Sequence, residues 1–319
     1  ERIAKALPQA DAFGVARLDE ALALRVAGVI KPIVLLEGVF NAFELPVLAV
    51  NKLQTIVHNE EQLKAITDTN LVLEEPLKVW LKIDTGMHRL GIHPKDFQYY
   101  YQSLKNSSNV HDDIVLMSHF SCADDLENSV TSAQIQLFES TIEGLANPRS
   151  FANSAAINAW PQSHYEWIRP GLMLYGVSPM TEPKPSAKEL GLKPVMTLQS
   201  SLIAIREIEA GSAVGYGGAW ISDKKTTIGV VAIGYGDGYP RHAVNGTPVL
   251  INGRKVPLIG KVSMDMITVD LGENSTDAVG DLVTLWGQGL AVEEVAKYAT
   301  TIPYELLCNI TRRVKVQVN

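Results

Sequence analysis

Short apolar runs alternate with amphipathic segments through roughly the first 190 residues, and this alternation constrains the fold more than any other feature of the sequence. Apolar residues recur at helical spacing in segments such as Leu18–Ala27, Glu60–Ala65 and Ser132–Gly144. Strands that alternate with helices in this way pair in parallel through right-handed crossovers. The expected strands are Ala12–Ala16, Ile33–Glu37, Thr55–His58, Val79–Asp84, Ile114–Phe120, Ser150–Asn153 and Trp167–Tyr175.

These strands number about seven, whereas a closed (β/α)8 barrel of the TIM type needs eight. The chain also opens at Glu1 inside a helix-like segment with no start signal ahead of it, although a helix in this pattern should follow a strand. We therefore expect an α/β barrel domain over residues 1–190 whose first strand lies ahead of Glu1 and is missing from this sequence. An open barrel is the alternative.

The pattern changes after a proline-rich stretch, Met180–Pro194, and predicts a mostly β domain over residues 191–319. Asn252-Gly253 lies at the centre of an apolar run and is typical of a two-residue hairpin turn. The other expected elements are strands at Val195–Glu207, Thr226–Ile233, Val262–Leu271, Leu282–Trp286 and Arg313–Val318, and a helix at Val292–Ala299.

Composition excludes several classes of protein. A net charge of −7 argues against binding of nucleic acid, which attracts basic surfaces. No apolar run is long enough to span a membrane, and the N-terminal residues do not resemble a signal peptide. Two cysteines, Cys122 and Cys308, are too few for a disulfide framework and suit a reducing compartment. We therefore expect a cytoplasmic protein with no membrane or nucleic-acid partner.

Three side chains lie near the carboxyl ends of predicted strands, where barrel enzymes place their sites. Lys82 is inside an apolar strand, and its burial near Arg89 requires deprotonation, a carboxylate such as Asp84, or a covalent modification such as carbamylation. Alternatively, Lys82 points to the outside of the barrel and keeps its ammonium group in water. Arg89 suits bidentate binding of a carboxylate. His119 is either a site residue or a core histidine with satisfied hydrogen bonds.

Two later strand ends are rich in small residues and backbone donors. Phe151 leads into Asn153-Ser154-Ala155, and Trp167-Ile168 leads into Arg169-Pro170-Gly171-Leu172, where the glycine lets the backbone approach a ligand closely. Consecutive loops of this kind late in a barrel predict a phosphate site, with Arg169 beside it as a fixed cation. The alternative is a core strand that carries a surface arginine.

Two loops of the β domain, Val214–Gly218 and Ile233–Tyr239, present Tyr216 and Tyr235 between glycines. Tyrosines in such loops either pack at a hinge or serve as acid/base groups. The second role requires a neighbouring histidine or arginine that lowers the phenol pKa from its ordinary value of about 10.

Motifs in both halves of the chain form one ordered series. They are DAFGVAR (Asp11–Arg17), KIDTGMHRLG (Lys82–Gly91), SHF (Ser118–Phe120), NSAA (Asn153–Ala156), RPGLMLYG (Arg169–Gly176), VGYGG (Val214–Gly218), IGYGDGYPR (Ile233–Arg241), VSMDM (Val262–Met266) and PYE (Pro303–Glu305). From Ala12 to near its C-terminus the chain thus closely resembles alanine racemase, a pyridoxal-phosphate enzyme. The resemblance implies an isomerase that combines a barrel with a C-terminal β domain, in agreement with the strand and helix pattern.

The resemblance implies a cofactor site built mainly from the barrel. Ser154, the backbone of Gly171 and Leu172, and Tyr304 would hold the phosphate of pyridoxal 5'-phosphate, with Asn153 in the same cofactor site. Arg169 would face the pyridine nitrogen, and His119 would stack or bond near the ring.

The resemblance also implies a homodimer whose active sites are shared. Arg89 would bind the substrate and be oriented by Lys82, which matches the carbamylated lysine of the family. Tyr216 would act across the dimer interface as the base on the L-alanine face, and Tyr235 would narrow the substrate entrance. The backbone around Met264 and Asp265 would meet the substrate carboxylate.

The second base of the family is a lysine in a Lys-Ala-Asn-Ala-Tyr-Gly-His-Gly motif after the first barrel strand, and this motif is absent from the sequence. The family pattern places it just ahead of Glu1, where the strand count is also one short. We expect the intact protein to racemise alanine by two bases, for peptidoglycan or for L-alanine catabolism. The polypeptide as given should lack the covalent bond to the cofactor and be inactive.

Other interpretations share the same architecture. Amino-acid decarboxylases with this cofactor would be expected to place an acidic residue, rather than Arg169, at the pyridine nitrogen, and an aspartate beside the cysteine where Cys308 has none. A broader racemase, for example one that prefers serine, differs in pocket size and stays open. A non-catalytic homologue that binds pyridoxal phosphate is the further alternative if the lysine is truly absent.

Overall fold

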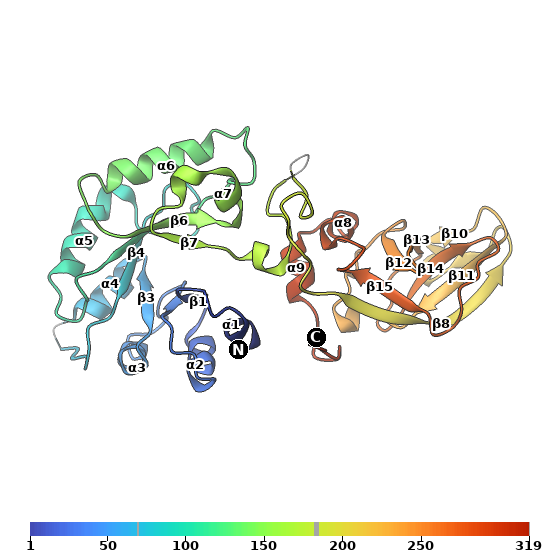
Figure 1. Cartoon of the computed structure of the whole chain (residues 1–319), viewed down its shortest axis with the longest axis horizontal. Coiled ribbons are helices and arrows are strands. Elements are labelled where there is room, and N and C mark those ends of the chain that lie inside the picture. The colour runs from blue at the N-terminus through green and yellow to red at the C-terminus, as the bar shows by residue number, and fades with distance from the viewer. Residues whose placement is uncertain (69, 182–184, 319) are drawn as a thin grey trace. The chain divides into compact units, whose positions relative to one another are not determined.

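The computed structural model describes residues 1–68, 70–181 and 185–318, and it divides into two compact units, Glu1–Pro170 and Gly171–Asn319 (Figure 1). Part of the proline-rich stretch Met180–Pro194, residues 182–184, lies outside the described residues. The domain boundary at residue 190 stays a prediction.

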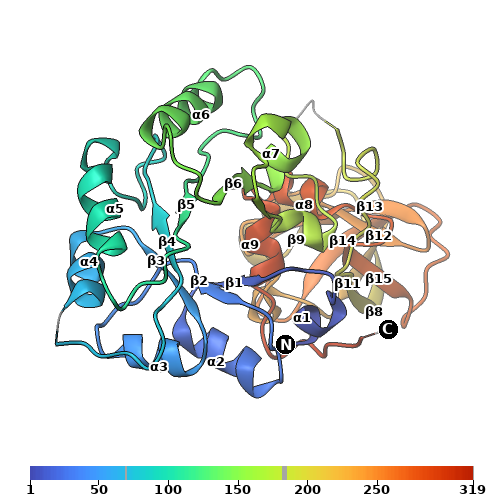
Figure 2. The same cartoon turned by 60° about the vertical axis from the view of Figure 1, so that its left-hand side comes forward.

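The first unit is a curled sheet of parallel strands that pair in sequence order, with helices along its outer side (Figure 2). Its seven strands in the described residues confirm the predicted alternation and the barrel-type fold. They are β1 (Phe13–Val15), β2 (Ile33–Leu35), β3 (Gln54–Val57), β4 (Val79–Lys82), β5 (Val115–Met117), β6 (Arg149–Asn153) and β7 (Trp167–Arg169). The helices are α1 (Arg2–Ala6), α2 (Leu18–Val26), α3 (Glu44–Val50), α4 (Glu60–Thr67), α5 (Phe97–Lys105), α6 (Val130–Thr141) and α7 (Ser154–Ala159).

The strands form because their residues are apolar on both faces. Every residue of β2, β4 and β5 is buried, as expected when one face of a parallel sheet meets helices and the other meets side chains inside the curl. Val34, Ile56, Trp80, Val115 and Met117 form one core cluster inside this unit. Because all the strands run in parallel, their carboxyl ends meet at one edge of the sheet, and the loops that follow them are neighbours.

One predicted strand is partly wrong. Trp167–Tyr175 was expected to be extended throughout, but β7 ends at Arg169 and Leu172–Tyr175 forms a 3-10 turn, η3. Pro170 has no N–H to continue the sheet, and Gly171 turns the chain with φ −118° and ψ −83°. Two further 3-10 turns, η1 (Pro94–Asp96) and η2 (Pro161–Ser163), begin at proline itself.

The second unit contains a closed antiparallel barrel with strand order β11-β14-β13-β12-β15-β8. These strands are β8 (Leu198–Ile208), β11 (Thr226–Val231), β12 (Pro248–Ile251), β13 (Arg254–Ile259), β14 (Ile267–Gly272) and β15 (Leu282–Trp286). A small ribbon joins β9 (Ala213–Val214) to β10 (Trp220–Ile221), and α8 (Val292–Tyr298) and α9 (Pro303–Cys308) complete the unit. The predicted mostly β domain is confirmed.

The predicted hairpin turn at Asn252-Gly253 is confirmed by its backbone conformation. Both residues have positive φ, 49° and 79°, which is what a two-residue hairpin turn of type I′ requires. Residues Pro248–Ile251 and Arg254–Ile259 pair on either side of it. A large apolar cluster that includes Trp286, Leu285 and Val231 fills the barrel.

Two assignments near the C-terminus differ from the sequence prediction. Arg313–Val318 was predicted to be a strand, but these described residues form a turn and an irregular segment. The residues just before this segment bond to a loop and not to a strand. Thr311 donates its N–H to the carbonyl of Asp237 and its hydroxyl to the carbonyl of Gly236. Helix α9 was not predicted, because its single turn and a half is too short for a periodic pattern.

Candidate active site

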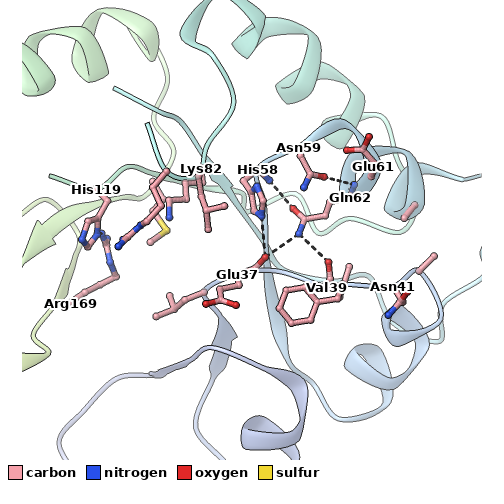
Figure 3. Close-up of a pocket in the computed structure, with 17 residues that line it drawn as sticks. Glu37, Val39, Asn41, His58, Asn59, Glu61, Gln62, Lys82, His119 and Arg169 are labelled. Atoms are coloured by element: carbon pink, nitrogen blue, oxygen red, sulfur yellow. Dashed lines mark hydrogen bonds between the residues drawn. The ribbon is translucent and has the colours of Figure 1, made fainter. Parts of the chain in front are cut away.

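A pocket of about 840 Å³ opens at the carboxyl edge of the parallel sheet, and all the residues that line it belong to the first unit (Figure 3). Lys82, Arg89, His119 and Arg169 from the sequence prediction line it together. The remaining lining residues come from the ends of neighbouring strands and from the helices after them: Leu36, Glu37, Val39, Phe40, Asn41, Ala42, His58, Asn59, Glu61, Gln62, Ala65, Leu90 and Met117.

Lys82 is the last residue of β4 and is only 5% exposed. It lines the pocket, so the alternative of an outward-pointing lysine is wrong. Burial lowers the pKa of its ammonium group to about 8, and the positive charges of Arg169 and Arg89 contribute to that shift. Asp84 and Glu37 act in the opposite direction. A neutral amine is therefore far more accessible at Lys82 than at an ordinary surface lysine.

Arg169 and His119 meet at one end of the pocket (Figure 3). Nη2 of Arg169 donates to the carbonyl oxygens of Ser118 at 2.8 Å and Phe151 at 3.3 Å, and lies 3.3 Å from Nδ1 of His119. Nη1 donates to the hydroxyl of Ser150 at 2.5 Å. Arg169 is thus held by strand ends of the sheet, which overturns the alternative of a surface arginine.

Burial at this end of the pocket shifts the pKa values of two side chains. Burial lowers the pKa of Arg169 to about 10, so the guanidinium stays charged at neutral pH. Burial also lowers the pKa of His119 to about 3, and the positive charges of Arg169, Lys82 and Arg89 add to the effect. His119 is therefore a neutral imidazole. Since Nη2 of Arg169 is a donor, the Nδ1 of His119 is the acceptor in their contact.

Arg89 lies in a loop whose shape is fixed by Asp84. Oδ1 of Asp84 accepts the backbone N–H groups of Gly86, Met87 and His88 at 3.0 to 3.1 Å. Burial alone would raise the pKa of the Asp84 carboxyl, but these hydrogen bonds outweigh it, and the pKa is lowered. The loop returns to the sheet at Gly91, where a side chain would strike the backbone of Asp84 at 2.5 Å. The sequence-predicted glycine loop is thus a rigid turn that presents Arg89.

The predicted phosphate loops lie at two other strand ends. Asn153 caps α7, accepting the N–H of Ala156 at 3.0 Å, and Ser154 opens the helix and is 3% exposed. Gly171 and Leu172 begin the second unit, with Leu172 in the apolar core of that unit. None of these residues is among the described residues that line the pocket.

The tyrosine side chains of the second unit are largely exposed to solvent. Tyr216 is 69% exposed in a 3-10 turn, η4 (Tyr216–Gly218), and Tyr304 is half-exposed near the start of α9. The turn η5 (Tyr235–Asp237) packs on the Met264 loop, because the N–H groups of Tyr235 and Gly236 donate to the carbonyls of Ser263 and Met264 at 3.0 and 2.9 Å. Tyr235, Met264 and Asp265 are thus brought together.

Arg313 links the turn that contains Tyr235 to the loop that contains Met264. Its Nη2 donates to Oδ1 of Asp265 at 2.6 Å, and its Nε lies 3.4 Å from Oδ1 of Asp237. A side chain at Gly236 would strike the guanidinium, so the glycine makes room for the arginine. The sequence analysis did not identify Arg313, and its only signal there was a short polar stretch between apolar residues.

The sequence analysis also missed the polar end of the pocket, formed by Glu37, His58 and Gln62 (Figure 3). Nε2 of Gln62 donates to the carbonyls of Glu37 and Val39, both at 3.1 Å, and the ring of His58 bonds the same Glu37 carbonyl at 3.1 Å. Burial lowers the pKa of His58. His58 follows β3 closely, as His119 follows β5. This shared position is the sequence signal that could have identified His58.

Two general features complete the description. The described residues contain no group of three or more histidine, cysteine, aspartate or glutamate side chains suited to hold a metal ion. Among the helices of the described ranges, none combines the length and apolar character that crossing a bilayer requires.

A curled parallel sheet with a cationic pocket at its carboxyl edge, followed by a separate β unit, defines an enzyme of the TIM-barrel type with an appended β domain. Two family models match the chain: the N-terminal domain of alanine racemase over residues 1–179 and its C-terminal domain over residues 195–318. The chain therefore belongs to the alanine racemase family, whose members are isomerases.

Individual relatives agree in sequence and in structure. An alanine racemase from Photobacterium profundum is 56% identical over 98% of this chain and 86% of its own length. The crystal structure of the biosynthetic alanine racemase from Pseudomonas aeruginosa superposes with a TM-score of 0.94 at 44% identity, covering 98% of this chain and 86% of that one. The alanine racemase from Bartonella henselae, solved with covalently bound pyridoxal phosphate, has a TM-score of 0.85 at 28% identity, with 98% and 86% coverage.

Proposed function

We propose that this protein racemises L- and D-alanine with pyridoxal phosphate by a two-base mechanism, in a homodimer with shared sites. The observation that carries the proposal is the cluster of Lys82, Arg89, His119 and Arg169 at the carboxyl edge of the sheet, in a chain of this family. The biological role that follows is supply of D-alanine for peptidoglycan or catabolism of L-alanine, in the cytoplasm.

The pocket fits an anionic, aromatic cofactor. Burial together with the charges of Arg169 and Arg89 lowers the pKa of Lys82 to about 8, which shows how strongly the pocket disfavours a further positive charge. A phosphate ester and a phenolic oxygen would relieve this repulsion. When bound, pyridoxal phosphate acidifies the α-hydrogen of an amino acid by delocalising the negative charge that remains on the carbon.

The residues that match the family's cofactor site would hold this cofactor. The fixed guanidinium of Arg169 would donate a hydrogen bond to the pyridine nitrogen, and neutral His119 would lie near the ring. Ser154, the backbone of Gly171 and Leu172, and Tyr304 would bind the phosphate, beside Asn153. Because Arg169 keeps its proton at neutral pH, it cannot protonate that nitrogen as a carboxylic acid would, and charge on the substrate carbon is less delocalised. Rapid return of a proton to that carbon, rather than a side reaction, is the expected result.

The substrate would be bound by groups from two protomers. Arg89, oriented by a carbamylated Lys82, would bind it from the barrel. The partner's loops would contribute Tyr216 as the base on the L-alanine face, Tyr235 at the entrance, and the Met264–Asp265 backbone at the carboxylate. Racemisation requires one acid/base group on each face of a planar carbon, and the phenol of Tyr216 would meet this need on one face only. The second base would be the family's lysine, whose motif the sequence does not contain.

The test follows loss of the α-hydrogen of L- and D-alanine in deuterated water, with the full-length protein loaded with pyridoxal phosphate. Tyr216→Phe should slow abstraction from L-alanine by about a hundredfold or more, and abstraction from D-alanine far less, because only one face loses its base. Tyr298→Phe, an exposed tyrosine of α8, is the matched control and should leave both rates unchanged.

Equal slowing of both isomers by Tyr216→Phe would remove Tyr216 as a side-specific base. If the wild-type protein exchanged serine faster than alanine, the broader-specificity alternative would replace alanine racemisation as the proposed activity.

A further inference from the structure

A buried glutamine on α6 connects two of the loops that carry pocket residues. Gln134 is 1% exposed. Its Nε2 donates to the carbonyl of His119 at 3.1 Å and to Oγ1 of Thr85 at 3.3 Å. Its Oε1 accepts from the N–H and the hydroxyl of Ser121, both at 3.1 Å. Every donor of this amide and both lone pairs of its oxygen are therefore used.

The bond to Thr85 continues toward Arg169. The hydroxyl of Ser118 donates to the carbonyl of Ile83 at 2.8 Å, so its 2.8 Å contact with Thr85 takes the Thr85 hydroxyl as donor. The backbone carbonyl of Ser118 in turn accepts Nη2 of Arg169 at 2.8 Å. The bonds thus run in one direction from Gln134 through Thr85 to Ser118, and such chains strengthen one another where water is excluded.

Packing supports the same connection. Gly86 adopts φ +135°, and a Cβ there would lie 3.5 Å from Cγ of Gln134, so the turn after β4 rests directly on this side chain. That turn presents Arg89, and the loop from Ser118 to Ser121 presents His119. Gln134 therefore joins the two loops, although it is not among the described residues that line the pocket.

We propose that Gln134 is a positioning residue for the pocket: it fixes the backbone that carries His119 and Arg89 and, through Thr85 and Ser118, the carbonyl that holds Arg169. A glutamine that only anchored α6 to the sheet would need one of these bonds, not bonds to both loops. The kinetic part of this inference rests on the proposed function, whereas its structural part does not.

The decisive variant is Gln134→Met, which keeps the length of the side chain and removes all four bonds. In cofactor-free protein labelled with ¹⁵N-histidine, the ring signals of His119 should shift, while those of His111 at the far end of β5 stay in place. In the loaded enzyme, kcat for alanine should fall by about ten- to a hundredfold, because small displacements of reacting groups are costly. Gln136→Met, on the exposed side of the same helix, is the control and should match the wild type in both measurements.

Unchanged His119 signals together with a wild-type kcat in Gln134→Met would overturn the proposal, as would equal shifts in Gln136→Met. If Gln134→Met does not fold, Thr85→Val decides, since it breaks the links to Gln134 and Ser118 with little change of shape. It should move the same His119 signals less far and lower kcat by about threefold. No change in that variant also counts against the proposal. A wild-type protein without racemase activity would refute the proposed function, and the histidine signals would still test Gln134.

Discussion

In the first unit Lys82 is 5% exposed and Arg169 is half-buried, whereas in the second unit Tyr216 and Met264 are more than half exposed. Arg169 is held by fixed partners, because it bonds two carbonyls and a hydroxyl of neighbouring strand ends. The exposed loops are held instead by backbone bonds and by the exposed ion pair of Arg313 with Asp265.

The difference concerns how far function and stability are coupled. A buried charged group is stable only in a complete set of partners, so a change there should lower both activity and the free energy of unfolding. An exposed phenol or ion pair contributes little to stability, so a change there should affect activity alone. Three variants test this contrast, in order of their expected effect on the free energy of unfolding.

The largest effect is expected for Arg169→Lys. Lysine keeps the charge but cannot bridge the hydroxyl of Ser150 and the carbonyls of Ser118 and Phe151. We expect the free energy of unfolding in urea to fall by about 2–4 kcal/mol and alanine racemisation by about two orders of magnitude. Arg2→Lys, in the exposed α1, should change neither. Wild-type stability of Arg169→Lys would break the contrast between the two regions.

The next effect depends on pH. The pKa of His119 is lowered to about 3 in the folded protein, mainly by burial, whereas an unfolded histidine has a pKa of about 6.5. Between these values the unfolded chain binds more protons than the folded one, so stability falls as pH drops from about 6.5 toward 3.

His119→Gln removes this contribution. From about pH 6.5 to 4.5, urea unfolding of the cofactor-free protein should show wild type losing more stability than the variant, by up to about 1.4 kcal/mol per pH unit. His111→Gln, at an exposed position, should follow the wild-type profile. Parallel profiles of wild type and His119→Gln would mean that the imidazole is not buried as a neutral group.

The smallest effect is expected for Arg313→Gln. Because Arg313 and Asp265 are about half exposed, losing their ion pair should lower the free energy of unfolding only slightly. Arg313 also steadies the loops of Tyr235 and Met264, so KM for alanine should rise about threefold, with less change in kcat and a smaller effect at high salt. Lys224→Gln, which breaks the exposed pair with Glu273, should leave KM unchanged. A loss of stability as large as that of Arg169→Lys would contradict the comparison.

Much of the fold could be predicted from local patterns. The parallel strands appeared as apolar runs because both of their faces are buried, and the Asn252-Gly253 turn appeared because few residues adopt positive φ at two consecutive positions. The strand predicted at Arg313–Val318 was wrong: Val316 and Val318 stay exposed, at 70% and 69%, and only Val314 packs on the core. An alternating apolar pattern does not show whether a neighbouring strand is present for the segment to pair with.

The candidate site was only partly predictable. Lys82, Arg89, His119 and Arg169 were recognised because each follows or ends an apolar run at the edge where barrel sites lie. Gln62 and Gln134 were not, because a glutamine inside a helix carries no local sign of what it will bond. Their partners lie up to 49 residues away in sequence, as with the bond from Gln134 to Thr85.

The alternation of strands and helices, the presence of a second β unit and the identity of the cationic residues follow from the sequence itself, because they depend on hydrophobic period and on residue chemistry. Protonation states, the orientation of Lys82 into the pocket and the bonds that join α6 to two strand loops were decided by the tertiary structure. These properties depend on distances between segments far apart in the chain, and on the exclusion of water that only packing produces.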